Sequence, residues 1–466
     1  MSAHRLPATT ADVGHTMSAL KSKGVTMLAI GSVDDAGVSR VEGVPVERLV
    51  HLTREGLQVS RKLDGSAVDD SCGRRDGDLR LVPDLARLVP LSEQPGWAWA
   101  PADAFDLDGS RSGGCQRWFA ATQVAAAEAA GLSVRMAFES EWSLVAPSSP
   151  SPSLNGTAMD EGRWAGADHD AATHPGQVGL GQVAEYGREL VATLGALGLR
   201  VQQFHPEHAP ARLGLSVVGN GPLGAADDVV LLRDAVRQVS ARHGRRASFA
   251  PIVEPGAPGC GARLRLSVHD ADGSTLADGT RRYLMRPVGE AFLAGVLREL
   301  PALCALGAAH PASYLRLRPS QRAGAWQCWS RESREAALRL VGGVIGTGKR
   351  STHAEVRSFD ASGNPYLVVG GVLAAGLAGV REELRLPLDT CGDPGELSDH
   401  ERAAAGILRL PTSLTETAEA FADSSVLAEA MGETLHGSVL AMRRADGKRY
   451  SDTMPDHLAA LSRWRY

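Results

Sequence analysis

The chain has 466 residues, enough for a large catalytic domain with a small partner domain. Apolar residues make up 43% and charged residues 22%, which excludes a disordered protein. The net charge of −5 favours neither a nucleic-acid partner nor a membrane surface, and no apolar run reaches the length of a bilayer-spanning helix. Six scattered cysteines without a CxxC pair, and an N-terminus unlike a secretory signal, predict a soluble cytoplasmic protein with reduced thiols.

The first hundred residues consist of short β-rich runs separated by turns. VTMLAIGSV (25–33) and VSRVEGVPV (38–46) are predicted to be strands joined by the turn DDAG. HLTREGLQVS and DLRLVPDL add further short elements before residue 86. We therefore predict a small α+β domain at this end of the chain.

A change of composition follows, and longer elements begin. Residues 117–134 have the apolar spacing of a helix that ends at Gly131, and VRMAFESEWSLV (134–145) follows as a strand. Residues 146–177 are rich in Ser, Pro and Gly and are predicted to form an exposed, flexible loop. Helices and strands then alternate at 183–199, 200–206, 232–244, 247–253 and 262–270. From residue 288 onward we predict mostly helix, including WSRESREAALR, interrupted by the strand THAEVRSF (352–359).

The segment FESEW contains two carboxylates whose spacing bears on the chemistry of the site. Glu139 and Glu141 are two residues apart, so on a strand both side chains point to the same face. Two like charges about 4 Å apart cost about 4 kcal/mol at an effective dielectric near 20, unless cations lie between them. A cation-facing pair is one interpretation, and a solvated strand face is the other.

Segments spread over roughly residues 25 to 450 resemble motifs of the glutamine synthetase family, in the family's order. They are DDAGVSRVEGVP, LDGSA, LVPDL, AFESEWSL, the segment around Glu207, ASFAPI, GCGARLRLS, SYLRLRPS, WSRESREAALR and EVRSFDASGNPYLVVGGVLAAGL. The resemblance implies an α+β fold, with an N-terminal β-grasp domain (1–105) and a catalytic domain of antiparallel sheet and helices (106–466). It also implies a homo-oligomeric ring, of two stacked hexamers or a related assembly, in which a loop of the neighbouring subunit completes each active site.

Enzymes of that family activate a carboxylate with ATP as an acyl phosphate, which an amine then attacks. The resemblance therefore implies a small-molecule substrate, ATP, and Mg or Mn to neutralise phosphate charge. It assigns metal-ligand positions to Glu139, Glu141, Glu207 and Glu355, and Glu207 is also assigned to catalysis. Asp64 matches the aspartate that the adjacent subunit offers to the incoming amine, although an aspartate before glycine is also an ordinary turn residue.

Arginines of the resembling segments receive roles in the same way. Arg316 matches a contact to the substrate carboxylate, and Arg357 matches a contact to substrate or phosphate. Arg334 and Arg339 match contacts to phosphate, with Arg334 assigned to catalysis as well. Arg331 is compatible with a solvated helix face. Asn364-Pro365-Tyr366 also matches the family and is expected to be structural.

The chain departs from the family where metal ligands are expected. Arg263 and Arg265 stand in place of two histidines, and a guanidinium cannot bind a metal ion. Arg212 and Gly214 replace a glutamine and a glutamate, and Arg322 stands where many members carry a glutamate. We assign Arg263 and Arg265 to nucleotide or phosphate and Arg322 to substrate, and predict a metal-poor or metal-free site held by Arg–Glu pairs.

Two classes of function remain open at this point. The first is a ligase that forms an amide of the γ-glutamyl type on a non-standard amine or acid. The second is a catalytically inactive or ATP-independent relative that serves binding, assembly, or acyl or amide transfer. Retention of Asp64, Arg316, Arg334, Arg339 and Arg357 favours the enzyme, whereas Gly214 and the loss of both histidines favour the second class.

Overall fold

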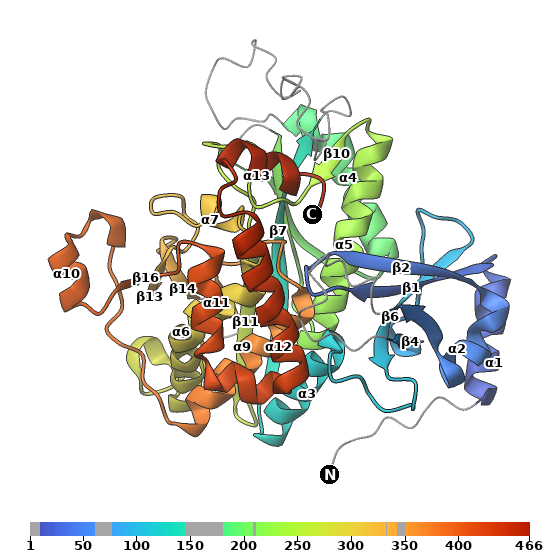
Figure 1. Cartoon of the computed structure of the whole chain (residues 1–466), viewed down its shortest axis with the longest axis horizontal. Helices are drawn as coiled ribbons and strands as arrows, with labels where there is room; N and C mark the ends of the chain where they lie inside the picture. The colour runs from blue at the N-terminus through green and yellow to red at the C-terminus, as the bar shows by residue number, and fades with distance from the viewer. Residues whose placement is uncertain (1–9, 61–76, 146–179, 208–210, 332, 343–350) are drawn as a thin grey trace.

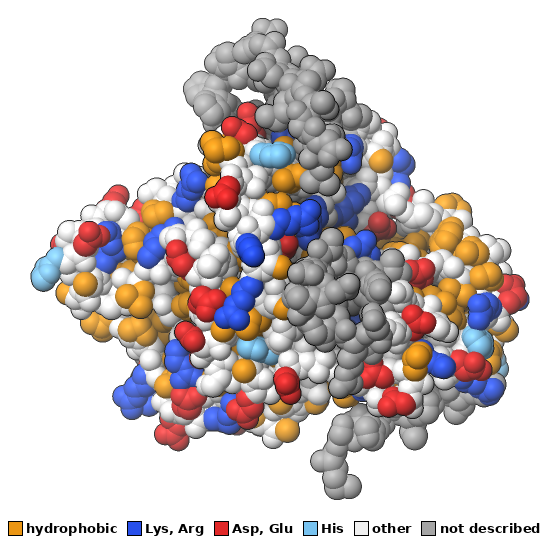
Figure 2. All heavy atoms as spheres, viewed as in Figure 1, with side chains coloured by type: hydrophobic (Ala, Val, Ile, Leu, Met, Phe, Trp, Pro, Cys, Tyr) orange, Lys and Arg blue, Asp and Glu red, His pale blue; other side chains and the backbone are white. Residues whose placement is uncertain are grey.

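A computed structural model describes residues 10–60, 77–145, 180–207, 211–331, 333–342 and 351–466. Two β-sheets organise the chain, one formed by the N-terminal strands and one within the larger helical part (Figure 1). This confirms the predicted α+β class. Acidic and basic side chains are interspersed over the visible face (Figure 2). The described part contains no helix with the length and apolarity needed to span a membrane. Asp64 and the predicted loop 146–177 lie outside the described residues.

The smaller sheet has the strand order β2-β1-β6-β4-β3, and β5 pairs with β6. Strands β1 and β6 are parallel, whereas the other pairs are antiparallel. Alternate β1 residues such as Leu28 and Ile30 are buried against Leu49 and Leu52 of α2. The elements are α1 (Thr10–Ser22), β1 (Met27–Val33), β2 (Ser39–Pro45), α2 (Leu49–Glu55), β3 (Leu57–Ser60), β4 (Asp78–Pro83), β5 (Val89–Pro90) and β6 (Trp97–Phe105). The two strands predicted around DDAG are confirmed, and the domain boundary at residue 105 stays a prediction.

The DDAG turn docks onto the larger part of the chain. Gly37 has a φ of +76°, and a Cβ there would lie 2.3 Å from the carbonyl oxygen of Ser362. The side-chain amide of Asn364 donates to the carbonyl oxygen of Asp34 at 3.1 Å. The side-chain oxygen of Asn364 also accepts backbone N–H groups of the first turn of α9 (Pro365–Arg381). Asn364 therefore caps a buried helix and fastens the N-terminal turn to it.

The larger sheet has the order β16-β13-β14-β15-β11-β7-β9-β8, with β10 on β7 and β12 on β11. All of its pairs are antiparallel except β13 with β14. Strand β7 lies between β11 and β9, so its side chains face residues from both neighbours. The strands are β7 (Ser133–Val145), β8 (Val201–Pro206), β9 (Arg212–Val217), β10 (Arg246–Ser248), β11 (Ala262–Asp270), β12 (Gly273–Ser274), β13 (Trp326–Arg331), β14 (Ala336–Val341), β15 (His353–Val356) and β16 (Leu408–Arg409).

Helices cover this sheet and form most of the core. Helix α9 is buried over residues 365–379 and packs against α3, α6 and α12. Close contact is possible because Gly295 of α6 and Gly379 of α9 bring the two backbones together, where a Cβ would meet backbone atoms at 2.2 Å. The helices are α3 (Gln116–Ala129), α4 (Leu180–Ala196), α5 (Pro222–Arg242), α6 (Pro287–Gly307), α7 (Ser313–Arg316), α9, α10 (Asp399–Ala404), α11 (Leu414–Ala422), α12 (Ser425–Arg449) and α13 (Pro455–Ser462).

The helix predicted over WSRESREAALR is wrong. Residues 326–331 and 336–341 form the parallel strands β13 and β14. Trp329, Leu338 and Leu340 are buried in the main core, whereas Arg334 and Glu335 lie in the connection between the two strands. The strand predicted at 247–253 is also shorter than expected, since β10 contains only residues 246–248.

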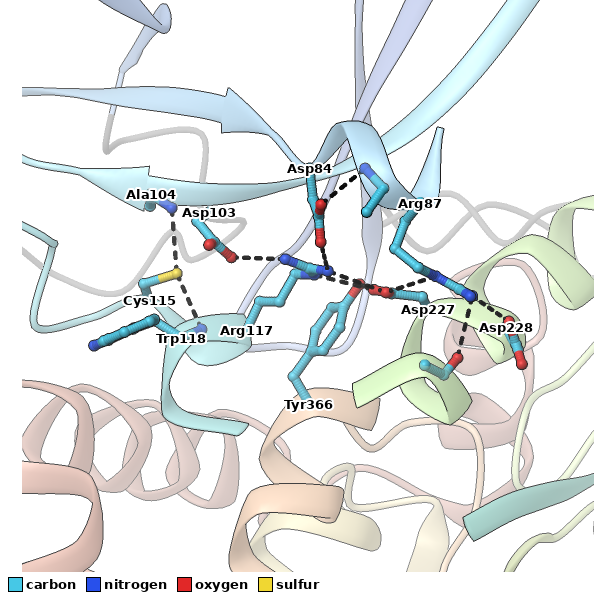
Figure 3. Close-up of polar contacts among 12 residues, drawn as sticks. Asp84, Arg87, Asp103, Ala104, Cys115, Arg117, Trp118, Asp227, Asp228 and Tyr366 are labelled. Carbon is cyan, nitrogen blue, oxygen red and sulfur yellow. Dashed lines mark hydrogen bonds and ion pairs between the residues drawn. The ribbon is translucent and has the colours of Figure 1, made fainter. Parts of the chain in front are cut away.

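A network of ion pairs joins the N-terminal part, which contains the smaller sheet, to the larger part of the chain (Figure 3). Arg117 of α3 donates to Asp84 at 2.8 Å and to Asp103 at 2.9 Å, both from the N-terminal part. The same guanidinium donates to Asp227 of α5 at 3.1 Å, and Tyr366 of α9 donates its hydroxyl to Asp227 at 2.8 Å. One arginine thus connects three carboxylates, two from the N-terminal part and one from α5.

His310 is buried beneath the C-terminal segment. Its side chain is 1% exposed, Nδ1 accepts the Ala312 N–H at 3.1 Å, and its ring packs against Tyr450 and Tyr466. Burial lowers the pKa of His310 to about 3. The folded protein therefore holds this imidazole neutral at pH values where the unfolded chain would protonate it.

We expect the free energy of unfolding of His310→Asn to fall less than that of the wild type as the pH is lowered below 6.5. Because the folded-state pKa lies below the ordinary value of 6.5, the wild type loses stability as the pH falls from 6.5 towards 3. By pH 5 this group costs the wild type about 2 kcal/mol relative to pH 7, and asparagine, whose Oδ1 can accept the Ala312 N–H, removes that cost. Urea denaturation of both proteins at pH 7 and pH 5 measures the difference. Equal losses in the two proteins would contradict the assignment.

Candidate active site

Two strands and the end of a third bring four predicted carboxylates together. Glu139 and Glu141 lie on the same face of β7, Glu355 lies on β15, and Glu207 directly follows β8. The first three are at most 4% exposed. Strand β11 runs between β7 and β15, which places its outward side chains among these carboxylates. Such a buried group of negative charges needs compensating positive charge.

Two arginines of β11 supply part of that charge. Arg263 is directly opposite Glu139 in the β7–β11 register, and its guanidinium contacts both Glu139 and Glu141. Arg265, two residues further along the same face, contacts the second oxygen of Glu139 and lies 3.4 Å from Glu355. The two arginines that stand in place of the family's histidines therefore link the carboxylates directly.

Arginines from other strands complete the cluster. Arg212 of β9 donates to Glu141 at 2.6 Å, and Arg339 and Arg357 each donate to Glu355 at 3.0 Å. Four carboxylates thus lie among five guanidiniums in the described residues: Arg212, Arg263, Arg265, Arg339 and Arg357. The cluster carries a small excess of positive charge without any bound ion, which suits a substrate with a phosphate or carboxylate group.

The pKa shifts of two of the carboxylates agree with this charge balance. Burial acts to raise the pKa of Glu355, but His353 and the guanidiniums around it hold that pKa well below its usual range. Burial likewise opposes ionisation of Glu207, but a hydrogen bond from His205 and the charges of Arg263 and Arg212 lower its pKa to about 2. Both carboxylates are therefore ionised at neutral pH, as metal ligands or ion-pair partners must be.

The remaining predicted arginines have different surroundings. Arg316 is 5% exposed, and its guanidinium donates to the carbonyl oxygen of Phe359 at 3.1 Å and lies 3.6 Å from Asp360. Arg357 also donates to the carbonyl oxygens of Arg334 and Arg322, at 3.0 and 3.1 Å. It thereby fixes two connections beside the cluster.

The side chains of Arg322 and Arg334 are exposed, and these two residues take part in the cluster through their backbones. Arg322 has a φ of +52°, and its N–H donates to Glu335 at 2.8 Å. Their exposure leaves both guanidiniums available to a bound anion, so their predicted substrate and phosphate roles stay predictions. Asp64 cannot be placed, because it lies outside the described residues.

The sequence reasoning missed His205. Its Nε2 lies 3.0 Å from Oε1 of Glu207. That hydrogen bond raises the pKa of His205 above its usual value, which favours the protonated imidazolium. His205 lies on β8, two residues before Glu207, and this spacing could have indicated that the two side chains share a face.

The described residues suit one divalent ion better than two. Arg263 and Arg265 occupy the space between Glu139, Glu141 and Glu355 with groups that cannot act as ligands. By contrast, Glu139, His205 and Glu207 present ligand atoms that all lie within 4.8 Å of one another. Nitrogen and carboxylate donors of this kind suit Mn²⁺ or Zn²⁺.

Comparison with known proteins gives the family to which this fold and site belong. The family profile described as glutamine synthetase, catalytic domain, matches residues 113–459. The chain belongs to the glutamine synthetase family and is a carbon–nitrogen ligase of that family. As a family, these enzymes use ATP and divalent metal ions.

Individual proteins of this family are similar to the chain over nearly its whole length. The chain is 42% identical over 459 residues to the gamma-glutamylpolyamine synthetase GlnA3 of Streptomyces coelicolor, covering 96% of this chain and 95% of that protein. It is 27% identical to the glutamine synthetase of Halobacterium salinarum, over 96% of this chain and 93% of the relative. A crystal structure described as a novel glutamine synthase homolog superimposes with a TM-score of 0.80 at 27% identity, covering 95% of this chain and 99% of that one.

Proposed function

We propose that the protein joins the γ-carboxylate of glutamate to a non-standard amine, with a polyamine as the first candidate. The retained cluster of four carboxylates and its associated arginines carries this proposal, because a binding or assembly role would not require them to converge. The name of the Streptomyces relative supports the choice of amine.

In the proposed reaction, an oxygen of the glutamate γ-carboxylate attacks the γ-phosphorus of ATP, and ADP leaves. The amine nitrogen then attacks the carbonyl carbon of the acyl phosphate, inorganic phosphate leaves, and the nitrogen loses a proton to a base. We assign Arg339 and Arg357 to the transferred phosphoryl group, since both already contact Glu355 at 3.0 Å in the cluster. Guanidinium forks match phosphate and carboxylate oxygens, so Arg263 and Arg265 supply charge that divalent ions supply elsewhere in the family.

The proposal extends to assembly. A ring of identical subunits would let Asp64 of one copy reach the amine bound by the next, as the family resemblance implies. Size determination by light scattering, together with loss of amide formation in Asp64→Asn, tests this part.

The purified protein, glutamate and ATP should be incubated with Mg²⁺ and, in turn, ammonia, putrescine, spermidine or spermine. We expect mass spectrometry to detect a γ-glutamylpolyamine, formed together with an equal amount of ADP. Arg339→Gln should lower turnover roughly a hundredfold, the usual effect of losing a donor that stabilises developing charge. Glu355 keeps Arg357 in that variant, so the fold should persist.

Arg331→Gln is the matched control, because Arg331 is exposed and lies over the ring of Tyr283, away from the carboxylates. Its turnover should equal that of the wild type. Folded protein that forms no amide with any of these amines would overturn the proposal. An amide formed without ATP would also overturn it and would indicate an ATP-independent transferase.

A further inference from the structure

We infer that His205 has taken over a ligand position lost at Gly214, so that one divalent cation binds between Glu139, His205 and Glu207. This inference concerns the same site as the proposed ligase reaction and rests on it for its chemical meaning. Three observations carry it: the strand register, the space beside Gly214, and the geometry of the donor atoms.

The register places the two residues side by side. Strands β8 and β9 are antiparallel, and His205 is paired with Gly214. The chain then leaves β8, passes Glu207, whose N–H donates to the carbonyl oxygen of Arg212 at 2.9 Å, and returns along β9. A side chain at position 214 would therefore point to the same face as His205 and Glu207.

The imidazole occupies the space that a side chain at position 214 would need. A Cβ on Gly214 would lie 2.6 Å from Nε2 and 2.8 Å from Cε1 of His205, and 3.2 Å from Oε1 of Glu207. The two approaches to the imidazole are closer than Cβ contacts in proteins, so the imidazole in this position leaves no room for a side chain at 214. The replacement of glutamate by glycine and the placement of His205 are thus two parts of one local change.

The donor atoms form a compact set. The ligand atoms of Glu139, His205 and Glu207 lie within 4.8 Å of one another, and Nε2 of His205 is 3.0 Å from Glu207. Two carboxylates and an imidazole are a frequent ligand set for Mn²⁺ and Zn²⁺, with water or substrate oxygens completing the coordination. A bound ion would polarise a phosphoryl oxygen next to the arginine cluster.

Electron paramagnetic resonance of free Mn²⁺ tests the site without any turnover. Titration of the full-length protein with Mn²⁺ alone should show one bound ion per chain in the wild type. His205→Ala should weaken binding by about tenfold or more, since loss of even an outer-sphere partner of a ligand costs about 10–100-fold. His269→Ala is the control: this histidine is hydrogen-bonded to Ser267 on β11, outside the donor set, and its loss should leave binding unchanged.

The swapped double variant His205→Ala/Gly214→Glu provides the sharper test. It removes the imidazole and restores a carboxylate at position 214, so Mn²⁺ binding should recover to near the wild-type level. Gly214→Glu alone should bind Mn²⁺ poorly, because the imidazole and the new side chain compete for the same space. Thermal melts of each variant identify any that fail to fold.

Equal Mn²⁺ affinity in the wild type and in His205→Ala would overturn the inference, as would a wild type that binds no Mn²⁺. A double variant that folds but does not recover binding would overturn it as well. Because binding is read without substrates, the metal site can fail while amide formation is observed, and amide formation can fail while the metal site is observed.

Discussion

Glu139→Gln should lower the free energy of unfolding by about 3 kcal/mol, measured by urea denaturation in the presence of EDTA. Glu139 is 4% exposed and contacts Arg263 and Arg265 with its two oxygens. Removal of its charge leaves two largely buried guanidiniums with weaker compensation, and breaking a buried pair by losing one partner costs about 3–5 kcal/mol. The lower value applies because Arg263 is still paired with Glu141, and Arg265 is still paired with Glu355.

A surface pair supplies the control for this prediction. Glu189 accepts from Arg242 at 2.6 Å, but both side chains are about one-third exposed, so Glu189→Gln should cost less than about 1 kcal/mol. Adding Arg265→Met to Glu139→Gln should recover part of the loss, because it removes one of the poorly compensated charges. A Glu139→Gln protein as stable as the wild type in EDTA would show that the arginines do not depend on this carboxylate.

Arg117→Met should cost about 4 kcal/mol and weaken the attachment of the N-terminal domain (Figure 3). Arg117 is 5% exposed, and Asp227, one of its three partners, is fully buried. Burial acts to lower the pKa of Arg117, but the charge of Asp227 outweighs it and the pKa is raised. Among the residues that the structure describes, the variant would leave Asp227 paired with Arg87, at 3.2 Å, and with the hydroxyl of Tyr366.

Urea denaturation and limited proteolysis together measure this effect. The variant should unfold at lower urea concentration and be cleaved faster between the two domains. Arg111→Met is the matched control, because Arg111 also pairs with Asp103, at 3.1 Å, but is 37% exposed, and its loss should cost less than about 1 kcal/mol. Similar losses in the two variants would contradict the view that burial makes Arg117 the important partner.

Part of this site could be predicted from sequence because it depends on local periodicity. Glu139 and Glu141 are two residues apart on one strand, so this pair was expected to share a face. The exchange of metal ligands for arginine also predicted Arg–Glu pairs. Which arginine meets which glutamate could not be predicted, since it depends on the register between strands more than a hundred residues apart.

Other features depend on tertiary packing and escaped the sequence reasoning. The strands β13 and β14 are short, and the charged run between them gave the segment a helical appearance, whereas burial of Trp329 and Leu338 selects strands. His205 was missed because its importance depends on the residue opposite it, Gly214, on the next strand. The guanidinium of Arg316 donates to the backbone carbonyl oxygen of Phe359, a long-range contact that the sequence did not indicate, and its predicted substrate role stays a prediction.

The central claim is that guanidiniums replace most of the cationic charge that the family obtains from metal ions. Anomalous diffraction from crystals grown with Mn²⁺ and ADP tests it most directly. We predict one manganese peak per chain, between Glu139, His205 and Glu207, with Arg263 and Arg265 still in contact with Glu139, Glu141 and Glu355. Two manganese peaks among Glu139, Glu141 and Glu355, with the arginines displaced, would contradict it.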